Sequence, residues 1–66
     1  MSTLGDDYPK EQERLRKLIQ VYTDLGPVGT FGKVMIEDVL RRADRAAIEG
    51  DLTSMISVYQ EMRECK

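Results

Sequence analysis

The chain has 66 residues, enough for one domain, and a domain this small buries only about 60% of the surface that its unfolded chain exposes. It contains no histidine and a single cysteine, Cys65, which excludes an internal disulfide and a Cys/His zinc site. The formal net charge of −2 argues against a general nucleic-acid binder, and no apolar run approaches the roughly 18 residues of a membrane span.

The N-terminal segment, residues 1–6, is small and polar and is expected to be disordered, with one helical domain following over 7–66. Asp7 can cap a first helix, and Pro9 suits the opening turn of that helix. Apolar residues then recur at helical spacing: Leu15, Leu18, Ile19, Tyr22 and Leu25. The pair Gly26-Pro27 is expected to end this helix.

The next segment allows two interpretations, a loop with Thr30 as a helix cap or the first turns of a helix that begins with Pro27. The second is preferred, because at 100° per residue Gly29 and Gly32 fall on the apolar side of the helix. That side also carries Met35, Ile36, Val39, Leu40, Ala43, Ala46 and Ala47. Glycines on a buried side would let another helix approach closely. This second helix is predicted to be the longest and to run to about Glu49.

A third helix is predicted after Gly50, with Asp51 as its cap, and it should reach Arg63 or beyond. Residues 15–25 and 52–62 share the pattern L-x-x-[LM]-I-x-V-Y-x-[DE]-[LM]. Because every apolar position matches, the first and third helices should present the same stripe to the second helix between them. The predicted fold is therefore all-α, three helices in antiparallel hairpins. The apolar arcs are too wide for three short helices to cover, which predicts a homodimer.

The apolar faces also provide candidate residues for a dimer or partner interface. These are Tyr22, Phe31, Gly32, Met35, Val39, Tyr59 and Met62. Tyr22 and Tyr59 occupy equivalent positions of the repeat, where tyrosine is typical of a core or an interface. Phe31 is the only phenylalanine and stands beside small residues, as interface anchors often do, so it belongs either to a dimer core or to a partner site.

Three arginines cluster on the outer face of the second helix. Each has a carboxylate four positions away: Glu37 for Arg41, Asp38 for Arg42 and Glu49 for Arg45. Such pairs are typical of a solvated helix face rather than of a DNA-reading patch. No serine or cysteine has a histidine partner, and the glycine-rich segment does not match the spacing of a phosphate-binding loop. We therefore expect no enzyme, no cofactor and no metal.

Two resemblances add to these patterns. Residues 43–62 resemble the helical hairpin of tetratricopeptide repeats, although the chain holds too few units for a solenoid. The order Tyr22-x-x-Leu25-Gly26-Pro27-x-Gly29-x-Phe31-Gly32, with Met35-Ile36-Glu37, Gly50-Asp51 and Tyr59-x-Glu61-Met62, resembles short accessory proteins of Mu-like transposable phages.

The phage resemblance implies a small helical dimer that binds a host regulatory protein and inhibits or redirects it. A quorum-sensing transcription factor and a pilus assembly factor are targets of this kind. Two alternatives stay open, a small DNA-binding regulator and a structural or assembly subunit. The N-terminus lacks the basic start and apolar run of a signal peptide, so a cytoplasmic location is expected, the host cytoplasm if the chain is phage-encoded.

Overall fold

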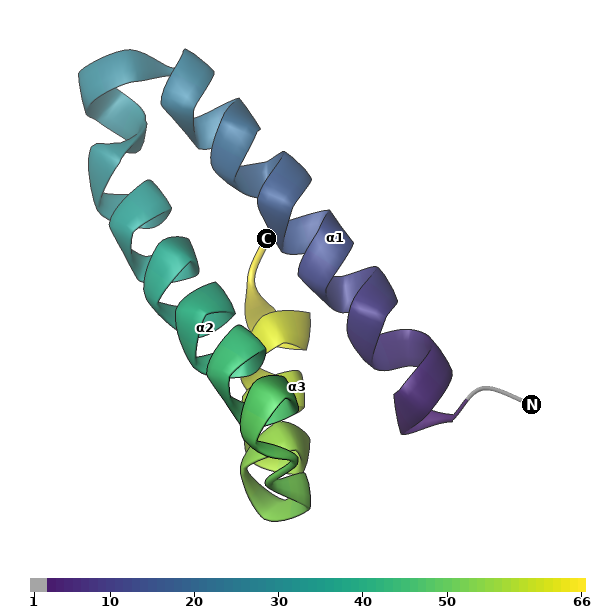
Figure 1. Cartoon of the computed structure of the whole chain (residues 1–66). Coiled ribbons are helices and arrows are strands. Elements are labelled where there is room, and N and C mark those ends of the chain that lie inside the picture. Colours follow the sequence, from purple (N-terminus) through teal and green to yellow (C-terminus); the bar gives the residue numbers. More distant parts are fainter. Residues whose placement is uncertain (1–2) are drawn as a thin grey trace.

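A computed structural model describes residues 3–66, and within them the chain forms three α-helices and one 3-10 turn (Figure 1). The elements are α1 (Leu4–Asp24), the 3-10 turn η1 (Gly26–Gly29), α2 (Thr30–Glu49) and α3 (Leu52–Glu64). The prediction of an all-α protein with three packed helices is confirmed.

The first helix begins earlier than the sequence suggested. Thr3 is its cap, and the Thr3 hydroxyl accepts a hydrogen bond from the backbone N–H of Asp6 at 3.2 Å, so the prediction that Asp7 caps the helix is wrong. Of the segment 1–6 that was expected to be disordered, residues 1–2 lie outside the described part, and the others form the cap and first turn. With 21 residues against 20, α1 and not α2 is the longest helix.

The two predicted helix ends are confirmed by backbone geometry. Gly26 follows α1 with a φ of 71° and Gly50 follows α2 with a φ of 67°, both in the left-handed region that glycine adopts without strain. Asp51 then caps α3, because its carboxylate accepts a hydrogen bond from the N–H of Ser54 at 3.2 Å.

The segment between α1 and α2 combines the two interpretations of the sequence. Pro27 lies at the start of a 3-10 turn, and regular α-helix begins at Thr30, so the predicted α-helix from Pro27 is only partly correct. The close approach at the glycines is confirmed. A Cβ atom at Gly32 would lie 3.0 Å from the ring of Tyr22, and one at Gly29 would lie closer still to the Tyr22 carbonyl oxygen.

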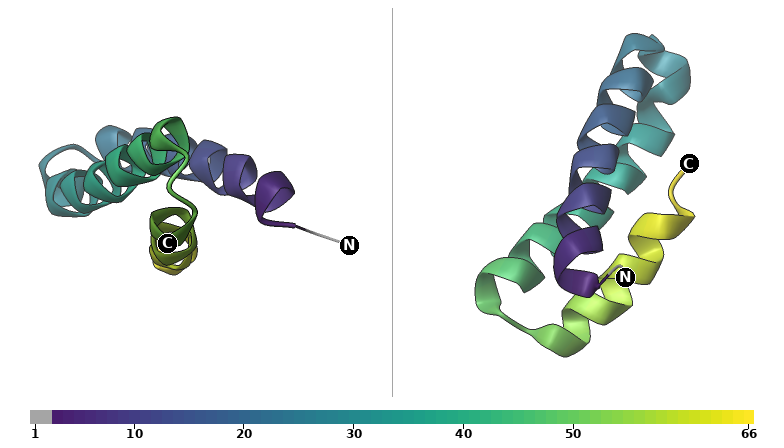
Figure 2. Two further views of the ribbon diagram at one scale, coloured as in Figure 1. Left: turned by 60° about the horizontal axis from the view of Figure 1, so that its bottom comes forward. Right: turned by 90° about the vertical axis from the view of Figure 1, so that its right-hand side faces the viewer.

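The helices form two layers. α1 and α2 make a hairpin that opens away from η1, and α3 runs back along one face of that hairpin (Figures 1 and 2). Both outer helices pack chiefly on α2, as predicted. The core consists of Tyr8, Leu15, Ile36, Leu40, Ala43, Val58 and Met62. No helix within residues 3–66 has the length and apolar character needed to cross a membrane.

The repeated stripe does not have the same burial in its two copies, so that part of the prediction is wrong. Leu15 is fully buried whereas its counterpart Leu52 is 61% exposed, and Val21 is 55% exposed whereas its counterpart Val58 is buried. At 100° per residue, the buried arc of α3 is turned by roughly 80° relative to that of α1. The reason is that α3 lies against both helices of the hairpin, so the centre of its buried arc points between them.

Tyr8 is a core residue that the sequence analysis did not identify. Its side chain is buried, its hydroxyl donates a hydrogen bond to the Ala43 carbonyl oxygen at 2.6 Å, and its ring stacks on Tyr59 with centroids 6.4 Å apart. A signal was present, because Tyr8 stands four residues after Leu4 and seven before Leu15. Apart from one proline, the residues between Tyr8 and Leu15 are polar, so the apolar stripe was not recognised as continuing to Tyr8.

Candidate functional site

A groove of about 350 Å³ lies between the end of α1, the first half of α2 and the C-terminal end of α3. We call it the Tyr22 groove, and its lining residues are Tyr22, Gly32, Met35, Ile36, Val39, Glu61, Glu64, Cys65 and Lys66. Its floor is apolar, whereas α3 contributes two carboxylates to its rim. The hydroxyl of Tyr22 donates a hydrogen bond to the Lys66 carbonyl oxygen at 2.6 Å, which ties the chain after α3 to α1.

The structure places the predicted interface residues in four different settings. Four of them line the Tyr22 groove together: Tyr22, Gly32, Met35 and Val39. Phe31 lies outside the groove with 77% of its surface exposed. Tyr59 is half-buried on another side of the molecule, with the guanidinium of Arg63 6.0 Å from its ring centroid. Met62 is completely buried, so it has no surface to offer a partner.

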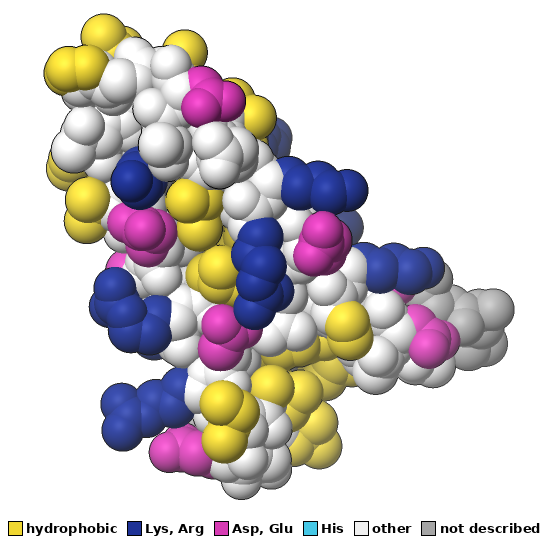
Figure 3. All heavy atoms as spheres, turned by 45° about the horizontal axis from the view of Figure 1, so that its top comes forward, with side chains coloured by type: hydrophobic (Ala, Val, Ile, Leu, Met, Phe, Trp, Pro, Cys, Tyr) yellow, Lys and Arg dark blue, Asp and Glu magenta, His cyan; other side chains and the backbone are white. Residues whose placement is uncertain are grey.

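Exposed apolar side chains gather at the end of the molecule where α1 joins α2, next to the Tyr22 groove. We call this surface the apolar end, and it consists of Val21, Leu25, Val28, Phe31, Val34 and Met35. Figure 3 shows hydrophobic side chains around this end of the hairpin. Leu25 was assigned to the buried stripe of the first helix, but it is 54% exposed. Single exposed apolar residues are ordinary, whereas a group of them at one end is typical of an interaction surface.

Arg42 joins α2 to α3, a link that the sequence pattern did not reveal. Its guanidinium donates two hydrogen bonds of 2.8 Å to the carboxylate of Glu61, which lowers the pKa of that carboxyl. Arg42 also binds Asp38 at 3.1 Å, as predicted. The predicted pair of Arg41 with Glu37 is wrong, because Arg41 lies 3.5 Å from Asp38 instead.

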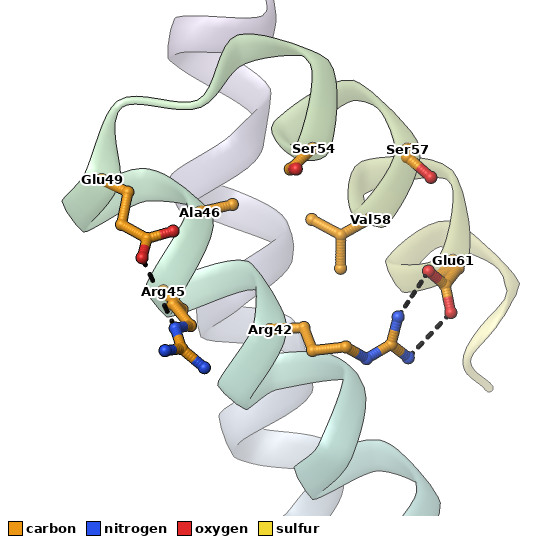
Figure 4. Close-up of a pocket in the computed structure, with 8 residues that line it drawn as sticks. All are labelled: Arg42, Arg45, Ala46, Glu49, Ser54, Ser57, Val58 and Glu61. Atoms are coloured by element: carbon orange, nitrogen blue, oxygen red, sulfur yellow. Dashed lines mark hydrogen bonds and ion pairs between the residues drawn. The ribbon is translucent and has the colours of Figure 1, made fainter.

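A second hollow of about 260 Å³ lies between α2 and α3 near the turn that joins them (Figure 4). The charged groups that line it pair with one another: Arg42 with Glu61, and Arg45 with Glu49 at 3.5 Å, the latter as predicted. Ser54, also in its wall, donates its hydroxyl hydrogen bond to Asp51. Within residues 3–66, no group of three or more His, Cys, Asp or Glu side chains could hold a metal ion. The Tyr22 groove is therefore the better candidate for binding.

The C-terminal end of α3 forms one wall of the groove and is fixed to α1 by Arg14. The Arg14 guanidinium donates hydrogen bonds to the carbonyl oxygens of Met62 and Cys65, the latter at 2.8 Å, while Glu11 pairs with it at 3.0 Å. These carbonyls lie at the end of α3, where the Met62 carbonyl also accepts a hydrogen bond of 3.1 Å from the cap N–H of Cys65. Cys65 is half-buried in this wall, and burial raises the pKa of its thiol.

Comparison of the chain with models of protein families, with curated proteins and with solved structures finds no match. The predictions about family and partner therefore stay predictions.

Proposed function

We propose that this protein is a small interaction module that binds a host regulatory protein and inhibits or redirects it. The observation that carries the proposal is the Tyr22 groove beside the apolar end. Together they present an apolar surface that the chain itself does not cover. The two surfaces share Met35, which is 55% exposed and lies at their boundary.

The shape and chemistry of the groove favour an amphipathic helix of the partner. Its floor offers Met35, Ile36 and Val39, which a helix can contact with apolar residues at i, i+3 and i+4. Gly32 has no side chain, so the groove is deeper beside the Tyr22 ring. On the rim, Glu64 would favour a basic residue on the polar face of the bound helix.

The resemblance to accessory proteins of Mu-like transposable phages supports a host regulator as the target, such as a quorum-sensing transcription factor. A module of this size would act by covering a surface that the regulator needs for its own contacts. Arginines on the surface of α2 are paired with carboxylates, so the structure offers no observation that favours DNA as the target.

The test compares capture of host proteins by the wild-type chain and by two matched variants. Met35→Glu places a charge in the groove, whereas Leu52→Glu places the same charge on an apolar residue of α3 outside it that is similarly exposed, 61% against 55%. A protein captured by the wild-type chain is identified by mass spectrometry, purified and titrated calorimetrically against all three chains.

We expect Met35→Glu to weaken binding by about tenfold or more, and Leu52→Glu to leave it unchanged. Circular dichroism checks that both variants stay folded. Equal affinity of the three chains, or no saturable binding to any purified host protein, would refute the proposal. A gel-shift series across salt concentrations adds a direct check on the DNA-binding alternative, because phosphate contacts give a steep salt dependence.

A further inference from the structure

The outer face of α2, which points away from both α1 and α3, carries a row of exposed residues at alternating spacings of three and four. We call it the outer stripe, and it consists of Phe31, Val34, Asp38, Arg41, Arg45 and Ile48. We propose that the outer stripe pairs with the outer stripe of a second copy of this chain, with the two α2 helices antiparallel. This inference goes beyond the proposed function and does not depend on it.

Apolar residues at both ends of the outer stripe have no role within the monomer. Phe31 is 77% exposed and Ile48 is 86% exposed, although the rest of the outer face is largely charged. Val34, one turn from Phe31, is also more than half exposed. Ile48 belongs neither to the Tyr22 groove nor to the apolar end, so a partner bound at those surfaces would leave it uncovered, whereas Phe31 belongs to the apolar end but does not line the groove.

The outer stripe is self-complementary in an antiparallel pair. Its spacing is the same from either end, as an isologous two-fold interface requires, so each contact occurs twice. Phe31 would meet Ile48 of the second copy at both ends of the pair. Asp38 would meet Arg41 of the second copy at the centre. Between these contacts, Val34 would pack against the aliphatic stem of Arg45 of the second copy.

Charge fixes the direction of the pair. A parallel arrangement would place each arginine of the outer stripe beside the same arginine of the second copy, and such like-charge contacts are unfavourable. The ion pairs of Asp38 with Arg41 at 3.5 Å and with Arg42 at 3.1 Å, and that of Arg45 with Glu49 at 3.5 Å, are all solvent-exposed, so exchanging them for contacts across the interface costs little.

The pair would leave the Tyr22 groove accessible, because the groove lies on the side of α2 that faces α3. One dimer would then present two grooves. A second copy explains the outer stripe better than an unrelated helix does. Only pairing with a second copy requires the stripe to be complementary to itself when it is read in the reverse direction.

The first experiment measures the dimer by sedimentation equilibrium at micromolar concentration. We expect twice the monomer mass for the wild-type chain. Arg41→Asp and Asp38→Arg should each weaken the dimer by about tenfold, because two attractive contacts become repulsive. The double variant that exchanges the two charges should recover most of the affinity. A monomer mass for the wild-type chain, or no recovery in a double variant that circular dichroism shows to be folded, would overturn the inference.

A second experiment tests the antiparallel geometry with Phe31→Cys and Ile48→Cys, each in a Cys65→Ser background. Residues 31 and 48 are 17 positions apart, about 25 Å along the helix. An equimolar mixture of the two variants should therefore form a disulfide-linked dimer, while neither variant should crosslink to itself. Self-crosslinking of the single variants, or no crosslink in the mixture, would overturn the inference. Host-protein capture by the groove would survive either result, so the two proposals fail separately.

Discussion

The close packing of the η1 turn on α1 predicts a large effect of Gly29→Ala. The backbone of Gly29 has φ −89° and ψ −4°, a conformation open to any residue, so only sterics oppose a side chain. An alanine Cβ would lie well inside 3.0 Å of the Tyr22 carbonyl oxygen and 3.1 Å from the Leu25 Cβ. The contact with the carbonyl is against backbone, so α1 and α2 must move apart at the turn.

The size of the effect follows from two opposing contributions. Alanine gains at most about 1 kcal/mol of helix propensity over glycine. Overpacking typically costs about 1–3 kcal/mol, and displacement of a helix backbone belongs at the upper end of that range. We expect a net loss of about 2 kcal/mol, which lowers the melting temperature of a domain this small by roughly 10 °C.

Thermal and urea unfolding followed by circular dichroism measure this loss. Gly5→Ala is the matched control, because a Cβ there meets only the Thr3 hydroxyl oxygen at 3.7 Å within α1. The control should melt at or slightly above the wild-type temperature. If Gly29→Ala also melted at or above the wild-type temperature, the close approach of α1 and η1 would be refuted.

Three further changes test other contacts. Tyr8→Phe should lose about 1 kcal/mol by removing the buried hydrogen bond to Ala43. Burial, with a smaller contribution from a nearby carboxylate, raises the pKa of Tyr8 above its ordinary 10.0. The wild-type chain should therefore lose stability as the pH rises past 10, and the phenylalanine variant should lose less in the same unfolding series. Hydrogen bonds from Arg42 lower the pKa of Glu61 below its ordinary 4.5, so that pair stabilises the fold above this pH and is lost as the pH falls through the lowered value. In Glu61→Gln, the free energy of unfolding should fall less at acid pH than it does in the wild-type chain. The difference should be less than about 1 kcal/mol, since both groups are partly exposed. Arg14→Met should speed amide hydrogen exchange in the last turn of α3, measured by mass spectrometry, because it removes two hydrogen bonds to carbonyls there.

Local chemistry predicted most of the helix boundaries. Gly26, Gly50 and Asp51 act through backbone conformation and capping, which depend on few neighbours. The start of α1 was missed because Thr3 and Asp7 are both good caps, and tertiary packing of the first turns decided between them. Pro9, expected in the opening turn, lies inside α1.

The rotation of α3 could not be predicted from the repeat. An apolar pattern determines which residues share a face of a helix. The residues at the edges of that face are buried or exposed according to where the neighbouring helices lie. Val58 became core and Leu52 became surface because α3 contacts two helices at once. For the same reason, four predicted interface residues meet in one groove, while Met62 lies in the core.

The contacts of the arginines show which interactions sequence spacing predicts and which it does not. Pairs four residues apart on α2 could be read from the chain, and two of the three occur. The contact of Arg42 with Glu61 and the contacts of Arg14 with the end of α3 join distant segments, so no local pattern indicates them.

Methionine methyl groups provide the most direct test of the groove as the binding surface. The chain would be labelled with ¹³C at these methyls and titrated with the purified host protein that it captures. Met35 lies at the groove, whereas Met55 is half-buried and Met62 is fully buried in the packed helices. We expect the Met35 resonance to shift in proportion to the bound fraction while those of Met55 and Met62 stay in place. A saturated complex in which the Met35 resonance does not move would contradict it.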